Sequence, residues 1–295
     1  MLAIVGPTAS GKSAVALSLA AELGAEIVSV DSMQVYRGLD IGTAKPSAAD
    51  RTEIRHHLID VAEPEDEFTV ADSQRMGRAA IEQAGGSMII AGGTGLAFRA
   101  IVDPLEFPGQ DPGLRAGLES LDLADLQKRL VAVDPTASDH VDMANSRRLI
   151  RALEVHAISG QTPSLRAATP EAAAVRSYQP LLDFAAVGLD AGPGLEARVV
   201  ARFDGMLERG LVAEVDALVP RLGRTAAQAV GYKELLPVVR GEQTLEEGRA
   251  AAIAATLAVA GNQRTYFRRD PRVRWLEWDD DPAVRIESAR RELKL

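Results

Sequence analysis

The chain has 295 residues, of which 46% are hydrophobic and 25% are charged, so its composition is that of an ordinary globular protein of one or two domains. It has no cysteine, which excludes disulfides, thiolate metal sites and a cysteine nucleophile. The net charge of −9 argues against a uniformly basic coat, and no apolar run is long enough to span a membrane, so we expect a soluble cytoplasmic protein.

The first third of the chain predicts strands that alternate with helices. Residues 2–5 (LAIV), 26–30 (EIVSV) and 87–91 (SMIIA) are short apolar or β-branched runs, each closed by glycine or aspartate. Between the first two runs, the Ala- and Leu-rich stretch from Ser13 to Leu23 predicts a helix that ends at Gly24. This alternation predicts a parallel sheet that binds its ligands beyond the carboxyl ends of the strands.

The middle of the chain predicts helices and no strand. Residues 114–133 are amphipathic, and residues 146–158 predict a second helix. Residues 162–180 contain three prolines and many alanines, so we expect a mobile connection there.

The last third returns to the α/β pattern. Residues 184–189 (FAAVGL) predict a strand, helices predominate up to Arg269, and residues 273–278 predict a late strand before a terminal helix. We therefore expect an α/β core of residues 1–112 and 181–295, with a helical insertion at residues 113–180.

The segment after the first strand fits the pattern G-x-x-x-x-G-K-[ST], which is typical of phosphate-binding loops. Its glycines let backbone N–H groups converge on phosphate oxygens, and the N-terminus of the next helix adds a partial positive charge. Lys12 supplies a full charge, and the Ser13 hydroxyl can hold Mg²⁺. We expect a polyphosphate on eight residues: Gly6, Pro7, Thr8, Ala9, Ser10, Gly11, Lys12 and Ser13.

Asp31 follows the second strand, at the edge of the sheet where the phosphate loop also begins. A carboxylate there could bind Mg²⁺ or accept a proton from a nucleophile, although a lone aspartate is also a common turn residue. The same loop carries Gln34, Tyr36, Thr43 and Lys45, which are too many polar groups for a plain connection.

Two segments together closely resemble the tRNA dimethylallyltransferase family: GPTASGKS at 6–13 and DSMQVYRGLDIGTAKP at 31–46. Further matches follow in chain order: HHLID at 56–60, GGTGL at 92–96, RLIRALEV at 148–155 and AVGYKE at 229–234. The resemblance implies a P-loop NTPase-like parallel sheet flanked by helices. It also implies transfer of a dimethylallyl group from its diphosphate to N6 of the adenosine 3′ of a tRNA anticodon. We expect Mg²⁺ as the cofactor and a monomer as the active form.

The resemblance implies roles for single residues. Asp31 would be the general base, Thr94 would contact the substrate, and Lys12 would stabilise the departing diphosphate. The extruded base would be gripped by Asp31, Ser32, Met33 and Gln34. Further tRNA contacts would come from Arg115, Arg147, Arg148 and Arg151 in the insertion, and from Gln228, Gly231, Tyr232 and Lys233 in the core. The composition of the stretch that contains them adds Arg264 and Arg268 as candidate tRNA contacts.

Two other features of the sequence stand apart from this resemblance. Five arginines lie between Arg264 and Arg274 with Tyr266 and Phe267 among them, which favours nucleic-acid binding but also fits a solvated charged surface. His56 and His57 have no second pair of metal ligands at suitable spacing, so we expect them to be structural.

The sequence departs from the family pattern at two places. Ala97 stands where the family usually has tyrosine, which we expect to loosen the helix behind Thr94. Leu257, Gly261 and Asn262 stand where relatives carry cations, so we expect weaker binding of tRNA or diphosphate.

Three alternatives stay open at this point. A small-molecule kinase also uses a phosphate loop, an aspartate after the second strand and arginines on a helical lid. An adenylate dimethylallyltransferase would act on a free nucleotide, and a non-catalytic relative would bind tRNA without modifying it.

Overall fold

The computed structural model describes residues 1–295 and divides into two compact units. The core unit comprises Met1–Ile101 and Leu182–Leu295, and the insertion unit comprises Val102–Leu181. The insertion unit starts earlier in the chain than residue 113, because Arg151 donates hydrogen bonds to the carbonyls of Pro108 and Gly109.

The core unit is built on one sheet of six parallel strands in the order β3-β2-β4-β1-β5-β6. The α/β fold class is confirmed, and all five predicted strands are present within one or two residues. Only the two-residue strand β3 was not predicted. The strands are β1 (Leu2–Val5), β2 (Glu26–Val30), β3 (His56–His57), β4 (Met88–Gly92), β5 (Ala185–Leu189) and β6 (Val273–Leu276).

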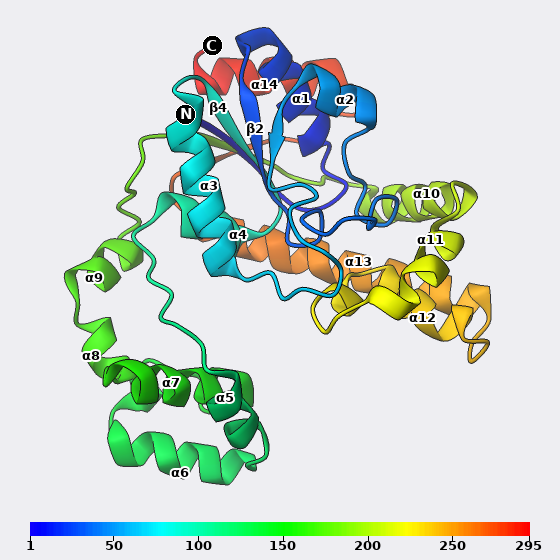
Figure 1. Cartoon of the computed structure of the whole chain (residues 1–295). Coiled ribbons are helices and arrows are strands. Elements are labelled where there is room, and N and C mark those ends of the chain that lie inside the picture. Colours follow the sequence, from blue (N-terminus) through cyan, green and yellow to red (C-terminus); the bar gives the residue numbers. More distant parts are fainter. The chain divides into compact units, whose positions relative to one another are not determined.

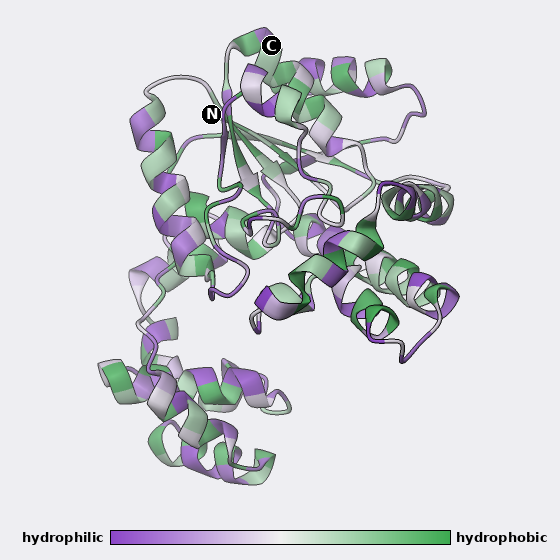
Figure 2. Ribbon diagram, turned by 45° about the vertical axis from the view of Figure 1, so that its right-hand side comes forward, coloured by the Kyte–Doolittle hydropathy of each residue, from purple (hydrophilic) through white to green (hydrophobic).

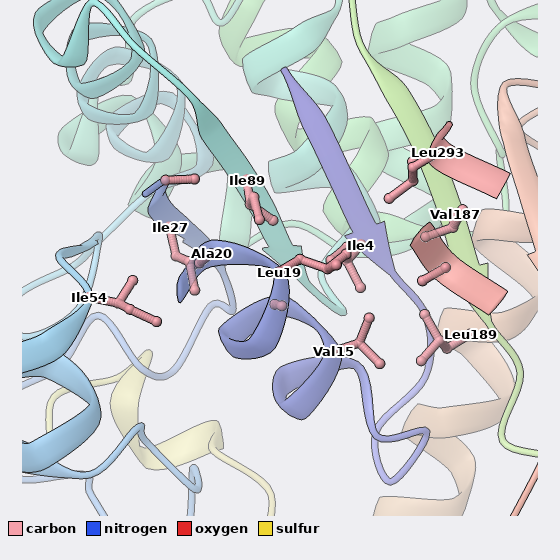
Figure 3. Close-up of a cluster of buried hydrophobic side chains, with 13 residues drawn as sticks. Ile4, Val15, Leu19, Ala20, Ile27, Ile54, Ile89, Val187, Leu189 and Leu293 are labelled. Carbon is pink, nitrogen blue, oxygen red and sulfur yellow. The ribbon is translucent and has the colours of Figure 1, made fainter. Parts of the chain in front are cut away.

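Helices α1 (Lys12–Leu23) and α14 (Pro282–Leu293) lie together on one face of the sheet (Figure 1). Figure 3 shows Val15 and Leu19 of α1 pointing at Ile4 of β1 and Ile89 of β4, and all four side chains are almost inaccessible to water. Their burial holds α1, and therefore the phosphate loop before it, at a fixed place on the sheet.

The other helices of the core unit carry both apolar and polar residues, whereas the strands are mostly hydrophobic (Figure 2). This difference is expected because a parallel sheet is buried on both faces. The helices are α2 (Ala48–Glu53), α3 (Val70–Ala84), α4 (Gly95–Val102), α10 (Leu195–Glu208), α11 (Leu211–Leu218), α12 (Tyr232–Val239) and α13 (Leu245–Arg268), with short 3₁₀ turns at Val219–Arg221 and Ala226–Gln228.

The insertion unit is entirely helical and has its own core. Fully or nearly fully buried leucines, among them Leu118, Leu126, Leu130 and Leu149, pack α5, α6 and α7 together. Its helices are α5 (Pro112–Glu119), α6 (Leu123–Val133), α7 (Ser146–Ser159), α8 (Pro163–Ala167) and α9 (Pro170–Arg176), with a 3₁₀ turn at Ala137–Asp139.

Two predictions for this region were wrong in detail. The amphipathic stretch 114–133 is two helices, because Asp122 caps the N-terminus of α6. Residues 162–180 are not a plain connection but contain α8 and α9, each with a threonine N-cap and proline in its first turn. No helix in the structure combines the length and the apolar character that a membrane span requires.

Candidate active site

The phosphate loop runs from the end of β1 into α1. Gly6 (φ +146°) and Gly11 (φ +80°) adopt backbone conformations that side chains rarely allow. A Cβ on Gly6 would lie 2.4 Å from the carbonyl oxygen of Leu189 in β5, so only glycine fits this first turn. The loop therefore has glycine at two positions where its backbone conformation favours that residue.

Lys12 is the charged residue of this loop. Its Nζ donates to the carbonyl of Pro7 at 3.1 Å. Burial lowers the pKa of Lys12 to about 8, which nearby Asp31 opposes and the charge of Arg202 reinforces. A bound anion would reverse this shift, so the lysine is suited to hold a phosphate group.

Two side chains that the sequence analysis missed support the loop. Arg202 of α10 donates to the Thr8 hydroxyl at 3.3 Å, and burial lowers the pKa of its guanidinium. Gln263 of α13 accepts the Thr8 N–H at 2.8 Å, and a Cβ on Gly93 would lie 2.4 Å from its amide nitrogen. Gln263 therefore packs against both the phosphate loop and the GGTGL turn.

Asp31 lies directly after β2, as predicted. Its Oδ1 accepts the N–H groups of Met33 at 2.9 Å and Gln34 at 3.3 Å, which makes a local turn. Its Oδ2 accepts no hydrogen bond from the protein. Asp31 therefore serves as a turn residue and still presents one carboxylate oxygen for chemistry.

Thr94 follows β4, and its hydroxyl accepts the N–H of Ser32 at 3.2 Å. This bond joins the GGTGL turn to the Asp31 loop. Behind it, Ala97 is buried, and Phe98 packs edge-on against Phe184 with ring centroids 5.5 Å apart. Phe98 itself has no exposed surface, so the aromatic side chain of α4 is packed at the residue next to Ala97.

The loops after β1, β2 and β4 open on two adjoining cavities. One, of about 510 Å³, contains Lys12, Ser13 and Asp31. The other, of about 290 Å³, contains Asp31 and Thr94 and has an apolar wall. That wall is formed by Val199, Phe203, Met206, Val230 and Val259. Five residues line both cavities: Thr8, Asp31, Thr43, Arg202 and Gln263. The cavity that contains Lys12 and the cavity with the apolar wall therefore meet at the Asp31 carboxylate.

A third cavity, of about 410 Å³, also borders the phosphate loop, because Lys12 and Ser13 belong to its lining. Trp278 also lines it, with the guanidinium of Arg198 3.8 Å and that of Arg285 4.4 Å from its ring centre. Asp280 lines the same cavity and accepts the indole N–H at 2.8 Å, so two cations and one carboxylate surround the indole.

The predicted tRNA contacts in the core unit differ in accessibility. Gln228 and Lys233 are exposed, and Gln228 lines the apolar-walled cavity. Gly231 is buried at the start of α12 (φ +92°). Tyr232 is fully buried, with its hydroxyl bonded to Glu214, so its ring is not available to a ligand in this structure.

The basic stretch near the C-terminus is largely paired within the chain. Arg264 and Arg268 both bind Asp190, at 2.9 and 2.6 Å. Arg272 pairs with Asp270, and Arg274 with Glu292, at 2.7 and 3.1 Å. These pairs reduce the positive charge that the sequence alone suggests.

The insertion arginines separate into two pairs. Arg115 and Arg151 each lie 2.6 Å from Glu154, which is fully buried. Burial alone would raise the pKa of Glu154, but the hydrogen bonds from these two arginines outweigh it and hold the pKa below its usual value. Arg147 is exposed without a partner, and exposed Arg148 makes only a 3.6 Å pair with Asp142.

The two histidines have structural partners. His57 bonds to Glu26 across β2 and β3 at 2.6 Å, and His56 bonds to the Ile54 carbonyl at 2.7 Å. No group of three or more histidine or acidic side chains in the structure is arranged to hold a metal ion.

Comparisons with known proteins place the chain among transferases that act on tRNA. The family model described as IPP transferase matches residues 34–270. The tRNA dimethylallyltransferase of Nocardioides sp. is 43% identical over 98% of this chain and 96% of its own length, and that of Streptomyces coelicolor is 44% identical over 94% and 89%. The solved tRNA isopentenylpyrophosphate transferase of Bacillus halodurans is 33% identical, with a TM-score of 0.69 over 99% of this chain and 96% of that chain.

Proposed function

The chain belongs to the tRNA dimethylallyltransferase family, and we propose that it transfers a dimethylallyl group from dimethylallyl diphosphate to N6 of the adenosine 3′ of the anticodon in certain tRNAs. The observation that carries this proposal is the position of Asp31 on the wall shared by the cavity of the phosphate loop and the cavity with the apolar wall. The reaction needs a cationic cavity for the diphosphate, an apolar cavity for the five-carbon group and a carboxylate beside the acceptor amine. These three features adjoin one another here.

The residues suit the chemistry. The bond between the allylic carbon and the diphosphate oxygen breaks as the bond from N6 to that carbon forms. Negative charge then grows on the diphosphate, where Lys12, Arg202 and the backbone amides of the loop stabilise it. The N6 proton passes to the free Oδ2 of Asp31, a step in which a general base typically contributes about 10²- to 10⁴-fold.

We also propose that Mg²⁺ accompanies the diphosphate. Magnesium prefers oxygen ligands and usually keeps several waters when it binds phosphate groups. The Ser13 hydroxyl is exposed at the start of α1 and fits this preference. When bound there, Mg²⁺ would neutralise charge on the diphosphate.

The acceptor adenosine must leave its base stack to reach this cavity, which costs a few kcal/mol that protein contacts offset. We propose that exposed Arg147 and Arg148 bind backbone phosphates of the anticodon arm, and that Gln228 and Lys233 contact the loop. We expect the protein to act as a monomer in the cytoplasm, where its tRNA substrate is found.

The test is mass spectrometry of an anticodon stem-loop incubated with the protein, Mg²⁺ and dimethylallyl diphosphate. We expect a prenyl adduct on one adenosine, and loss of the adduct with Asp31→Ala. Unmodified RNA would contradict the proposal. Parallel reactions with AMP as the acceptor, and with ATP as a phosphate donor to metabolites, separate it from the nucleotide transferase and the kinase.

A further inference from the structure

Glu214 of α11 holds the loop between Asp31 and Pro46 from outside. Its carboxylate accepts three consecutive backbone N–H groups: those of Asp40 at 3.3 Å, Ile41 at 2.9 Å and Gly42 at 3.3 Å. Hydrogen bonds to an ionised acceptor are stronger than neutral ones. A single side chain therefore fixes the position of three residues that lie far from it in sequence.

Tyr232 completes this contact from α12. It is fully buried, its hydroxyl donates to Glu214 and it also accepts the N–H of Gly42 at 3.2 Å. Burial and the neighbouring carboxylate raise the pKa of Tyr232, so it stays a donor. A Cβ on Gly42 would lie 2.4 Å from the tyrosine ring, so only glycine fits at position 42 beside this ring.

Thr43 and Ala44, which follow Gly42 in the chain, connect this contact to Gln34 and Asp31 at the candidate site. The amide Nε2 of Gln34 donates to the carbonyls of Thr43 at 3.1 Å and Ala44 at 3.3 Å, and its Oε1 accepts the Ser29 hydroxyl at 3.0 Å. The backbone N–H of Gln34 donates to Asp31. The orientation of the Gln34 side chain therefore depends on where residues 40–44 are held.

We propose that Glu214 and Tyr232 are positioning residues that set Gln34 and Thr43 beside Asp31 for the acceptor nucleotide. Neither side chain lines the reaction cavities, whereas Gly42, Thr43 and Asp31 do. They act through the loop and not on the reacting atoms. The inference rests on the proposed function, since it concerns the acceptor half of that reaction.

The experiment compares Glu214→Gln and Tyr232→Phe with the wild type and with Asp216→Asn, an exposed position on the same helix. Steady-state kinetics give kcat and KM for the stem-loop and for dimethylallyl diphosphate, and calorimetry gives the affinity for inorganic diphosphate. We expect Glu214→Gln to lower kcat/KM for the stem-loop by roughly ten- to hundredfold, since a hydrogen bond to a charged group is being weakened. We expect Tyr232→Phe to lower it less, and Asp216→Asn to leave it unchanged.

Diphosphate affinity separates positioning from general destabilisation. The proposal is supported if Glu214→Gln lowers kcat/KM for the stem-loop and leaves the affinity for inorganic diphosphate unchanged. The proposal is overturned if kcat/KM falls equally for the stem-loop and for dimethylallyl diphosphate, or falls for neither. A wild type that transfers no prenyl group to the stem-loop would overturn the proposed function and this inference together, whereas an active wild type matched by Glu214→Gln overturns only the inference.

Discussion

Asp31 shows how one carboxylate serves two purposes, since Oδ1 closes a turn and Oδ2 stays free. Asparagine keeps the Oδ1 acceptor but cannot take a proton. We therefore expect Asp31→Asn to slow single-turnover prenyl transfer by about 10²- to 10⁴-fold, while the affinity for diphosphate changes little. A variant that retained the wild-type rate would exclude Asp31 as the base.

Lys12 predicts a pH dependence of diphosphate binding. Burial lowers its pKa to about 8 in the free protein, and a bound anion raises it again, so the complex keeps a proton that the free protein loses above pH 8. By linkage, affinity is level below pH 8 and then falls by up to about tenfold per pH unit. Calorimetric titrations with inorganic diphosphate from pH 7 to pH 9.5 measure this fall.

The matched control is Lys12→Arg, since a guanidinium keeps its charge throughout this range. Titration of diphosphate itself affects both proteins equally. The same pH profile in the two proteins would show that Lys12 does not carry the effect.

At the scale of elements, α13 is continuous from Leu245 to Arg268 although Gly261 lies within it. A Cβ at Gly261 would meet no atom within 4 Å, and the position is exposed. We expect Gly261→Ala to raise the free energy of unfolding by up to about 1 kcal/mol, because alanine loses less backbone entropy in a helix. Thermal unfolding monitored by circular dichroism checks this, and a lower Tm would contradict it.

Elements with a strong local signal could be predicted from the sequence. The apolar runs of β1, β2 and β4, and the glycines of the phosphate loop, carry their information within a few residues. The pair of residues in β3 is too short to show a period, and the prolines of α8 and α9 indicate helix starts as well as breaks.

The same distinction applies to the candidate site. Lys12, Asp31 and Thr94 follow strand ends and belong to recognisable motifs. Arg202 and Gln263 reach the phosphate loop across 194 and 255 residues, and Glu214 reaches Gly42 across 172. No local pattern marks such contacts, because packing of α10, α11 and α13 brings them together.

At the scale of the whole molecule, the pairing of Arg264 and Arg268 with Asp190 reduces positive charge. It does so on the same helix as Leu257, Gly261 and Asn262, where the sequence leads us to expect cations in relatives. We expect the logarithm of tRNA affinity to fall less steeply with the logarithm of salt than in a relative with those cations. The double variant Gly261→Lys/Asn262→Arg should steepen the slope by up to about 2, near 1 for each added phosphate contact. The control is Gly261→Ala/Asn262→Ala, and equal slopes in the two double variants would contradict the expectation.

The separate core of the insertion unit predicts a separable effect on stability. Leu130 is fully buried among residues of that unit alone. We expect Leu130→Ala to destabilise the insertion by about 2–5 kcal/mol, seen as faster hydrogen exchange in residues 112–159. Diphosphate affinity should stay at the wild-type value, and a parallel loss there would show that the two units unfold together.

The position of the Trp278 indole beside the phosphate loop has a practical consequence. Trp275 and Trp278 are the only tryptophans of the chain, and both belong to the core unit. Fluorescence excited at the long-wavelength edge of the indole band, where tyrosine does not absorb, therefore reports on that unit alone, because the insertion has no tryptophan. A single cuvette can follow occupancy near Trp278 as quenching or enhancement, with no label attached to protein or RNA.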